Sequence, residues 1–244
     1  MTRFAARRQA KPDIYMVGFD ETNLPENWAR LQSLQPEAKL VQGITGIYAA
    51  YRVCAQQTKS PLFFVVDADN RVYDDFDFVP PQLPAPNELM VWWARNPIND
   101  LTYGHGGIKL FPTDIFRQPL TATGVDISTS IATRTRTITQ VASGHCFNTS
   151  PAKAWSTAFR ECAKMAQEMA IGRLKNDAQR VLETWCTTMN DAPFASFCVA
   201  GAKAGRAFGQ GFATDPAALA RINDYAWMQE QFDAWRAADG IPAV

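Results

Sequence analysis

The sequence predicts an α/β fold with a mostly parallel sheet and a helical extension at the C-terminus. In residues 13–70, two compact apolar segments and a short strand-like segment between them alternate with two segments whose apolar residues recur at helical spacing. From residue 150 onward, only the helical spacing continues. Alternating strands and helices form parallel sheets with right-handed crossovers, so the two observations together indicate an α/β part followed by helices.

These three segments are the predicted strands. Residues 13–19 end at the polar sequence 20–23, and residues 39–42 form a short second strand. Residues 62–66 are five consecutive apolar residues, which is typical of a central strand buried on both faces. The helices between these strands are predicted at residues 26–34 and 46–57.

The middle of the chain is less regular. Four prolines fall within residues 79–87, which predicts an irregular connection before a further strand at residues 88–95. Residues 96–107 are polar and rich in glycine, so we expect a loop there, followed by a short strand at residues 108–111. Residues 121–139 alternate Thr and Ser with apolar residues, which favours extended structure or long loops.

The C-terminal part is predicted to be helical. Ser150 and Pro151 suit the N-cap and first position of a helix that continues to about residue 172. Two more helices are predicted at about residues 177–188 and 216–236. The glycine-rich residues 201–211 between them are interpreted as a turn region.

The change of pattern also predicts the domain organisation. We expect an α/β part over residues 1–148 and a helical part over residues 149–244. The two parts are expected to pack together as a single compact unit, because a chain of this length can bury one sizeable core.

Composition excludes two classes of protein. The chain has 244 residues, 47% of them hydrophobic and 20% charged, with 24 basic and 24 acidic groups. A disordered chain needs lower hydrophobicity or a higher net charge. The apolar runs fall far short of the roughly 18 residues that a membrane-spanning helix needs, so we expect no membrane partner. The zero net charge gives no indication of a polyanionic partner, although a local basic patch would suffice for one.

Residue usage favours a cytoplasmic location. The five cysteines are odd in number, widely spaced and without a C-x-x-C pair, which argues against a disulfide scaffold or a zinc ribbon. We expect them to be reduced and to act as small core residues. Residues 1–12 form a basic arm that lacks the apolar segment of a secretory signal. The sequence leaves the oligomeric state open.

Two carboxylates follow the most apolar predicted strand. Asp67 and Asp69 form an Asp-Ala-Asp sequence directly after residues 62–66. In open α/β sheets, ligands bind outside the carboxyl ends of the strands. Carboxylates one residue apart can share a hard divalent cation, Mg²⁺ or Mn²⁺, whose other ligands include substrate phosphates. The pattern therefore indicates a metal and nucleotide site, and a solvated turn is the alternative.

Residues 13–70, which end in Phe-Phe-Val-Val-Asp-Ala-Asp-Asn, resemble the nucleotide-binding half of GT-A glycosyltransferases. The resemblance implies a GT-A-like, Rossmann-like fold in which a D-x-D motif holds a divalent metal and the diphosphate of a nucleotide sugar. It implies that Asp67 faces the ribose or the metal, and that Asp69 ligates the metal. A UDP-sugar is the expected donor. Further donor contacts are implied for Asp20, Thr22, Asn23 and Gly46.

Two later blocks resemble the TET-associated glycosyltransferases of phages. One runs from Trp93 to Phe111, and the other joins Phe147–Pro151 with Trp155–Lys164. The resemblance spans roughly residues 13–230. That family is linked to sugar transfer onto hydroxymethylated pyrimidines, such as hydroxymethylcytosine, in phage DNA. It therefore implies a hexosyltransferase of the host cytoplasm that has DNA as its acceptor.

The loop at residues 96–107 offers candidates for acid–base chemistry and ligand binding. Gly106 and Gly107 allow backbone to approach a phosphate or sugar closely, although a plain turn has the same composition. No G-K-[ST] sequence follows, so this is not a P-loop. An inverting transferase needs a carboxylate to accept the acceptor's proton, and Asp100 is the first candidate; as part of Asn-Asp it also suits a simple turn.

The two histidines and three arginines complete the candidates. Several metal-dependent GT-A enzymes recruit a late histidine as a further metal ligand, and His145 is our first candidate for it, ahead of His105. An ordinary hydrogen-bonded role is the alternative for each. His105 is also a candidate for acceptor contact. In residues 133–137, threonine hydroxyls alternate with two arginines, a pattern that suits contact with a phosphate backbone. The arginines expected to contact the acceptor or a phosphate are Arg134, Arg136 and Arg160. A solvated strand face is the alternative for the first two, and an ion pair with a carboxylate is the alternative for Arg160.

Two other functions fit the same pattern. A nucleotidyltransferase that makes a sugar nucleotide or a modified nucleotide would use a similar sheet and a metal. A glycine-rich loop after the first strand would favour that enzyme, and residues 20–23 contain no glycine. A non-enzymatic phage protein that binds nucleic acid is the second alternative, and the intact Asp67 and Asp69 argue against it.

Overall fold

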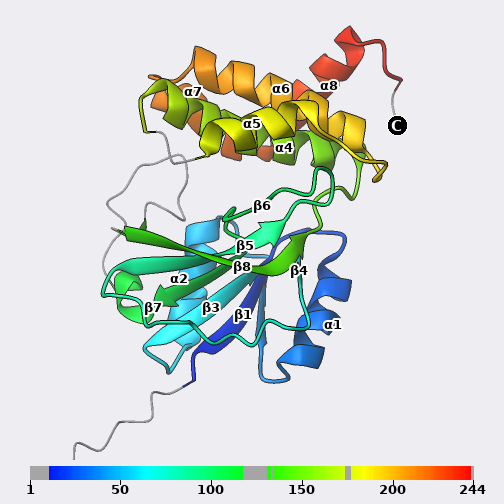
Figure 1. Cartoon of the computed structure of the whole chain (residues 1–244). Helices are drawn as coiled ribbons and strands as arrows, with labels where there is room; N and C mark the ends of the chain where they lie inside the picture. The colour runs from blue at the N-terminus through cyan, green and yellow to red at the C-terminus, as the bar shows by residue number, and fades with distance from the viewer. Residues whose placement is uncertain (1–10, 118–130, 133, 174–176, 243–244) are drawn as a thin grey trace, which may run out of the picture. The chain divides into compact units, whose positions relative to one another are not determined.

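The computed structural model describes residues 11–117, 131–132, 134–173 and 177–242, and Figure 1 shows its elements. These residues form two compact units, each described by itself. The sheet unit contains residues 11–94, 103–117, 131–132 and 134–143. The helical unit contains residues 95–102, 144–173 and 177–242. The α/β fold class with a helical C-terminal part is confirmed, whereas the packing of the two parts into one unit stays a prediction.

Three parallel strands form one side of the sheet. They are β1 (Asp13–Gly18), β2 (Lys39–Gln42) and β3 (Leu62–Asp67), with β1 between the other two. Tyr15 of β1 pairs with Lys39 on one side and with Val65 on the other. All three strands were predicted, β1 and β3 as compact apolar runs and β2 as a short strand between two helices.

The sheet continues beyond β3 with antiparallel pairs. β7 (Ile108–Pro112) pairs with β3, and β5 (Glu88–Arg95) pairs with β7 on its other side. The strand order is β2-β1-β3-β7-β5-β8-β4, and β6 pairs with β5. The remaining elements of this sheet and its rim are β4 (Asn70–Val72), β6 (Thr102–Tyr103), β8 (Arg134–His145) and the short 3-10 helix η1 (Thr113–Phe116). Extended structure is thus confirmed for residues 134–139, and residues 121–130 lie outside the described part.

One helix covers each face of the parallel strands (Figure 1). On one face, α1 (Leu24–Leu34) buries Leu24 and Leu31 in a core with Phe64. On the other face, α2 (Ile47–Gln57) buries Tyr51 and Cys54 in a core with Phe63 and Val65. Because successive strand residues point to opposite faces, β3 contributes side chains to both cores. This explains why its sequence is apolar from Leu62 to Val66.

The helical unit is built around the pair α4 (Pro151–Ala170) and α6 (Ala195–Gly211). The Oγ atom of Ser150 accepts a hydrogen bond of 3.1 Å from the amide of Lys153, which confirms the predicted N-cap. Around the pair lie α5 (Ala178–Thr187), α7 (Pro216–Ala220), the 3-10 helix η2 (Arg221–Asn223) and α8 (Tyr225–Ala238).

The interpretation of residues 201–211 as a turn region is wrong. These residues form the second half of α6, and Gly201, Gly205 and Gly209 lie on one face of it. A Cβ atom at any of the three would overlap a backbone carbonyl oxygen of α4, which belongs to Trp155, Phe159 and Ala163 respectively. The glycines are therefore there to let two helix backbones approach closely, and not to bend the chain.

The prediction of one helix over residues 216–236 is also wrong. The chain breaks at Asp224, whose backbone is extended with ψ 107°. Its Oδ1 atom accepts hydrogen bonds from the amides of Ala226 and Trp227, at 3.0 Å and 3.1 Å. Asp224 is therefore the N-cap of α8, a role that its short carboxylate side chain performs well.

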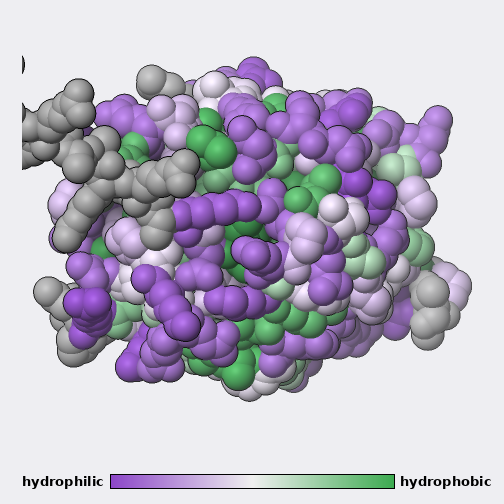
Figure 2. Space-filling view, turned by 90° about the horizontal axis from the view of Figure 1, so that it is seen from below, coloured by the Kyte–Doolittle hydropathy of each residue, from purple (hydrophilic) through white to green (hydrophobic). Residues whose placement is uncertain are grey.

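The exposed face of the molecule is mostly polar, as expected when the apolar side chains are buried in cores. Most of the face seen in Figure 2 is hydrophilic, and its hydrophobic residues gather in separate patches. Within the described ranges, no helix has both the length and the apolar character needed to cross a bilayer.

The first residue of β1 gives a test by pH. The Asp13 carboxylate accepts hydrogen bonds from Lys39 Nζ at 2.8 Å, Thr58 Oγ1 at 2.5 Å and the amide of Lys59 at 3.1 Å. Burial alone would raise the pKa of Asp13, but these hydrogen bonds together lower it from 3.8 to about 2. Because the folded-state pKa is lowered, the stabilisation is present above the unfolded value and is lost as the pH falls towards the folded one.

We therefore expect Asp13→Asn to lower the free energy of unfolding by about 1 kcal/mol at pH 7. The difference from the wild type should shrink as the pH falls from 5 to 2, as measured by urea unfolding at each pH. Asp75→Asn, at an exposed position, serves as the control. A difference that is the same at pH 7 and at pH 3 would contradict the assignment.

Candidate functional site

The loops that follow the three parallel strands lie together at the carboxyl ends of those strands. Asp20, Thr22 and Asn23 follow β1, Gly46 precedes α2, and the D-x-D sequence ends β3. Backbone hydrogen bonds join these loops: the amide of Gly43 donates to Gly18 O at 3.1 Å, and the amide of Ala68 donates to Val17 O at 2.9 Å. The carboxyl ends of parallel strands are where ligands of α/β sheets bind.

Asp67 is held by a lysine from a distant part of the chain. The ammonium nitrogen of Lys109, on β7, lies 2.9 Å from Oδ1 and 2.8 Å from Oδ2 of Asp67. The hydroxyl of Tyr51 donates to the same Oδ1 at 3.5 Å. Both carboxylate oxygens thus have a charged partner, and 30% of the Asp67 side chain remains exposed.

Lys109 is buried, with only 3% of its side chain exposed. It pairs with Val65 and Val91 in neighbouring strands, and its Nζ atom lies 5.4 Å from the centroid of the Tyr51 ring. Burial would lower the pKa of Lys109, but the charge of Asp67 and hydrogen bonds with Asp67 and Tyr51 raise it above its ordinary value. Lys109 is therefore a charged ammonium beneath the site.

Asp69 is positioned by a buried polar chain. Its Oδ1 atom accepts a 2.8 Å hydrogen bond from Nδ2 of Asn70, which is fully buried. The Oδ1 atom of Asn70 accepts in turn from Ser143 Oγ on β8, at 3.0 Å. The amide of Asn27 on α1 donates to Ala68 O at 2.8 Å. The backbone and side chains of the D-x-D segment are thus anchored to three other elements.

The glycine loop before β7 packs against the D-x-D segment. Gly107 O accepts from the amide of Asp67 at 2.9 Å, and a Cβ atom at Gly107 would overlap the side chain of Asn70. Gly106 has φ +98°, and a Cβ atom there would lie 3.2 Å from Cε of Lys109. Glycine is needed at both positions for reasons within the protein. Donor binding by Gly106 and Gly107 stays a prediction.

The loop after β1 is shaped by Glu21, which the sequence patterns did not single out. Its Oε2 atom accepts from the amide of Phe19 at 2.7 Å. The side chain of Phe19 remains 46% exposed at the start of this loop. Asp20 and Thr22 are also exposed.

Two candidate residues for chemistry, Asp100 and His145, lie in the helical unit. Asp100 has φ +58°, and its Oδ1 atom accepts hydrogen bonds from Arg95 Nε and Nη2 at 3.0 Å and 2.7 Å. The ring of His145 packs on that of Phe147, with centroids 4.7 Å apart. The roles of Asp100 as base and of His145 as metal ligand stay predictions.

The arginines have different surroundings. Arg136 binds both carboxylate oxygens of Glu88, at 3.2 Å and 2.8 Å, and the side chain of Glu88 is only 4% exposed. A backbone hydrogen bond from Ala85 and the Arg136 pair lower the pKa of Glu88. Arg134 is exposed on the same strand.

His105, also in the sheet unit, packs near an aromatic ring. The centroid of its ring lies 5.8 Å from that of Tyr103.

Arg160, in the helical unit, contacts Asn223 of η2 and Tyr225, the first residue of α8. It donates to Asn223 Oδ1 at 3.2 Å, and its guanidinium carbon lies 5.7 Å from the centroid of the Tyr225 ring. Tyr225 is 65% exposed, and Lys153 Nζ lies 5.9 Å from the same centroid. Contact of Arg160 with an acceptor or a phosphate stays a prediction, as it does for His105, Arg134 and Arg136.

The donor atoms at the D-x-D segment suit a hard divalent cation. Mg²⁺ and its relatives prefer carboxylate oxygens and take their remaining ligands from phosphate and water. Asp69, hydrogen-bonded to a neutral amide, and the outward side of Asp67 supply such oxygens. Among the residues that the structure describes, no cluster of three or more His, Cys, Asp or Glu could hold a metal ion. The residues therefore fit a cation that completes its coordination with a bound phosphate.

Sequence patterns missed Lys109, Tyr51, Asn70 and Ser143, all of which support the D-x-D segment. A signal for Lys109 was present, since a single lysine interrupts the apolar strand at residues 108–111. A charge in such a strand needs a buried partner. Its identity depends on the strand order, which the sequence does not state.

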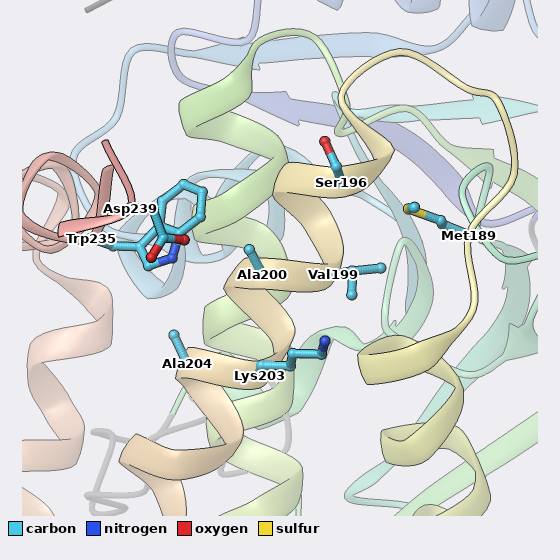
Figure 3. A pocket seen from close by; sticks show the side chains of 8 residues that line it. All are labelled: Met189, Ser196, Val199, Ala200, Lys203, Ala204, Trp235 and Asp239. Atoms are coloured by element: carbon cyan, nitrogen blue, oxygen red, sulfur yellow. The ribbon is translucent and has the colours of Figure 1, made fainter. Parts of the chain in front are cut away.

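A pocket of about 570 Å³ also lies in the helical unit, between α6 and α8 (Figure 3). Val199, Ala200 and Trp235 form its apolar wall, and Lys203 and Asp239 supply opposite charges. None of the residues predicted for the functional site lines this pocket.

Two solved structures are similar to this chain. One is a mannosyltransferase, PcManGT, from Pyrobaculum calidifontis in complex with GDP-Man and Mn²⁺; the match is 13% identical, covers 93% of this chain and 81% of that one, and has a TM-score of 0.41. The other is a glycosyltransferase involved in glycosylation of the major capsid of PBCV-1; it is 13% identical, covers 57% of this chain and 95% of that one, and has a TM-score of 0.34. No protein-family model and no curated protein matches the sequence. At these TM-scores the likenesses assign no function to the chain.

Proposed function

We propose that this protein is a metal-assisted glycosyltransferase that moves a hexose from a UDP-sugar to a hydroxyl group. The observation that carries the proposal is the D-x-D segment at the carboxyl end of β3, beside the loops that follow β1 and β2. Asp67 and Asp69 are anchored from beneath by Lys109 and Asn70, so their positions are set before a ligand arrives. Preorganised carboxylates at a strand end suit a nucleotide diphosphate with its cation.

Each part of the donor has a candidate contact. The exposed ring of Phe19 and the loop at Asp20, Thr22 and Asn23 suit the nucleoside. The N-terminus of α2, which follows Gly46 and has no side-chain cap, suits a phosphate. When bound at Asp69, a divalent cation would neutralise charge on the departing diphosphate.

Transfer needs a group that accepts the proton of the attacking hydroxyl. We assign this role to Asp100, whose carboxylate is oriented by Arg95. The positive φ of Asp100 is uncommon for a residue other than glycine, and such backbone strain gathers at functional sites. We keep His145 as the candidate for a further metal ligand.

For the acceptor we propose a 5-hydroxymethylpyrimidine in phage DNA. The exposed Tyr225 with Lys153 and Arg160 beside its ring supports this choice, because exposed aromatic rings with nearby cations suit stacked bases and their phosphates. A base within a duplex would have to flip out of the stack to reach an active site.

Binding of UDP provides the test. We expect calorimetric titration to show that the wild type binds UDP in the presence of Mn²⁺, and that Asp69→Ala lowers this affinity by about a hundredfold or more, since a charge-assisted contact is lost. Asp75→Asn, an exposed carboxylate outside the site, should bind like the wild type.

The possible results separate the candidate functions. Metal-dependent binding that disappears in Asp69→Ala supports the donor site, and transfer from UDP-sugars to hydroxymethylated DNA is then the activity to assay. If the folded wild type binds no UDP with Mn²⁺, the UDP-dependent transferase is wrong. Binding of a nucleoside triphosphate instead would favour a nucleotidyltransferase, and binding of no nucleotide would favour a non-enzymatic protein.

A further inference from the structure

The two aspartates of the D-x-D segment have different electrostatic surroundings. Asp67 has a buried ammonium within 2.9 Å of each carboxylate oxygen, and Asp69 accepts a 2.8 Å hydrogen bond from the side-chain amide of Asn70. Counting the two carboxylates and Lys109, the net charge of the segment is one negative unit instead of two. Charge count is one of the main determinants of the affinity of oxygen-ligand sites for divalent cations.

The ammonium has no route away from Asp67. Its side chain is 3% exposed and lies against the ring of Tyr51 on one side. The backbone of Gly106 passes over it, close enough that a Cβ atom would lie 3.2 Å from Cε. An arriving cation would therefore meet a positive charge that can neither leave nor be screened by water.

We propose that Lys109 is a permanent counter-ion that keeps the D-x-D segment from binding a divalent cation on its own. The cation then binds together with the nucleotide diphosphate, whose phosphates restore the missing negative charge. Lys109 acts as a positioning residue, because it contacts Asp67 and would not itself contact the cation. The joint binding of cation and nucleotide rests on the proposed function. The effect of Lys109 on binding of the cation alone does not depend on the nucleotide.

The test measures Mn²⁺ binding without nucleotide, from the loss of the electron paramagnetic resonance signal of free Mn²⁺. Lys109→Met keeps a chain of similar length but removes the charge. We expect it to bind Mn²⁺ at least about tenfold more tightly than the wild type, because one positive charge a few ångströms from the cation is gone. Lys109→Arg keeps the charge and should bind Mn²⁺ as weakly as the wild type.

A double variant shows whether the gain acts through Asp67. Asp67→Asn combined with Lys109→Met leaves Asp69 as the one charge and restores the net charge of the wild type, so the tight binding should disappear. Thermal melting of each variant checks folding. Lys109→Gln, which can still hydrogen-bond to Asp67, replaces Lys109→Met if the latter does not fold.

The results are unambiguous for Lys109. Unchanged Mn²⁺ affinity in a folded Lys109→Met or Lys109→Gln protein overturns the proposal, as does tight binding that persists in the double variant. A parallel titration with UDP and Mn²⁺ examines the proposed function. If the wild type fails to bind UDP while Lys109→Met gains Mn²⁺ affinity, the donor assignment is wrong and the counter-ion role stands.

Discussion

Asp67→Ala is expected to lower the free energy of unfolding by about 3–5 kcal/mol. The reason lies in Lys109, which this change leaves as a charged group in an apolar core with no carboxylate beside it. Breaking a buried ion pair by removing one partner is far more harmful than removing both. Urea unfolding, followed by tryptophan fluorescence, measures the loss.

A salt bridge at the surface provides the control. Arg71 and Glu26 are as close as the buried pair, at 2.6 Å, but their side chains are 46% and 73% exposed. Glu26→Ala should change the free energy of unfolding by less than about 1 kcal/mol. Adding Lys109→Met to Asp67→Ala should recover most of the lost stability. Equal losses in Asp67→Ala and Glu26→Ala would show that the burial of Lys109 is not what matters.

Gly205→Leu should be equally harmful to the helical unit, with a loss of at least about 3 kcal/mol. Its Cβ atom would overlap the backbone carbonyl oxygen of Phe159 on α4. A flexible side chain could move aside, but a backbone oxygen within a helix cannot move without separating α4 from α6. Thermal unfolding measures the effect, and a lower α-helical content at room temperature would be its extreme form.

Gly211→Ala distinguishes close packing from helix propensity. This glycine ends the same helix, and no atom lies within 4 Å of a Cβ placed on it. Alanine favours the helical state over glycine by up to about 1 kcal/mol, so this variant should be neutral or slightly stabilised. If the Gly205→Leu protein unfolds at the same temperature as the wild type, the glycines are not needed for the contact between α4 and α6.

The elements predicted best are those whose patterns depend on neighbouring residues in the sequence. The strands at residues 13–18 and 62–67 are mostly apolar because both of their faces are covered, and the D-x-D segment begins at the end of the second one. The cap at Ser150 is likewise a local signal. For this reason the α/β alternation and the position of the candidate site could be inferred without coordinates.

The features that escaped prediction depend on partners elsewhere in the chain. Glycines four residues apart can mark turns or a close helix contact, and only the position of α4 decides between them. Asp224 could lie within a helix or cap one, and the sequence favours neither strongly. Lys109 and Asp67 are 42 positions apart, so no local pattern could join them. The residues that support the D-x-D segment could therefore be identified only from the structure.

The position of β7 has a consequence for how the chain assembles. β7 lies between β3 and β5, although both of these strands precede it in the sequence. Until residues 108–112 arrive during synthesis, β3 has an open edge, and such edges invite pairing with other chains. The strand that closes this edge also carries the cation that neutralises Asp67. Shielding the nascent sheet from aggregation and balancing its inner charge are thus completed in the same folding step, which depends on slow, long-range strand pairing.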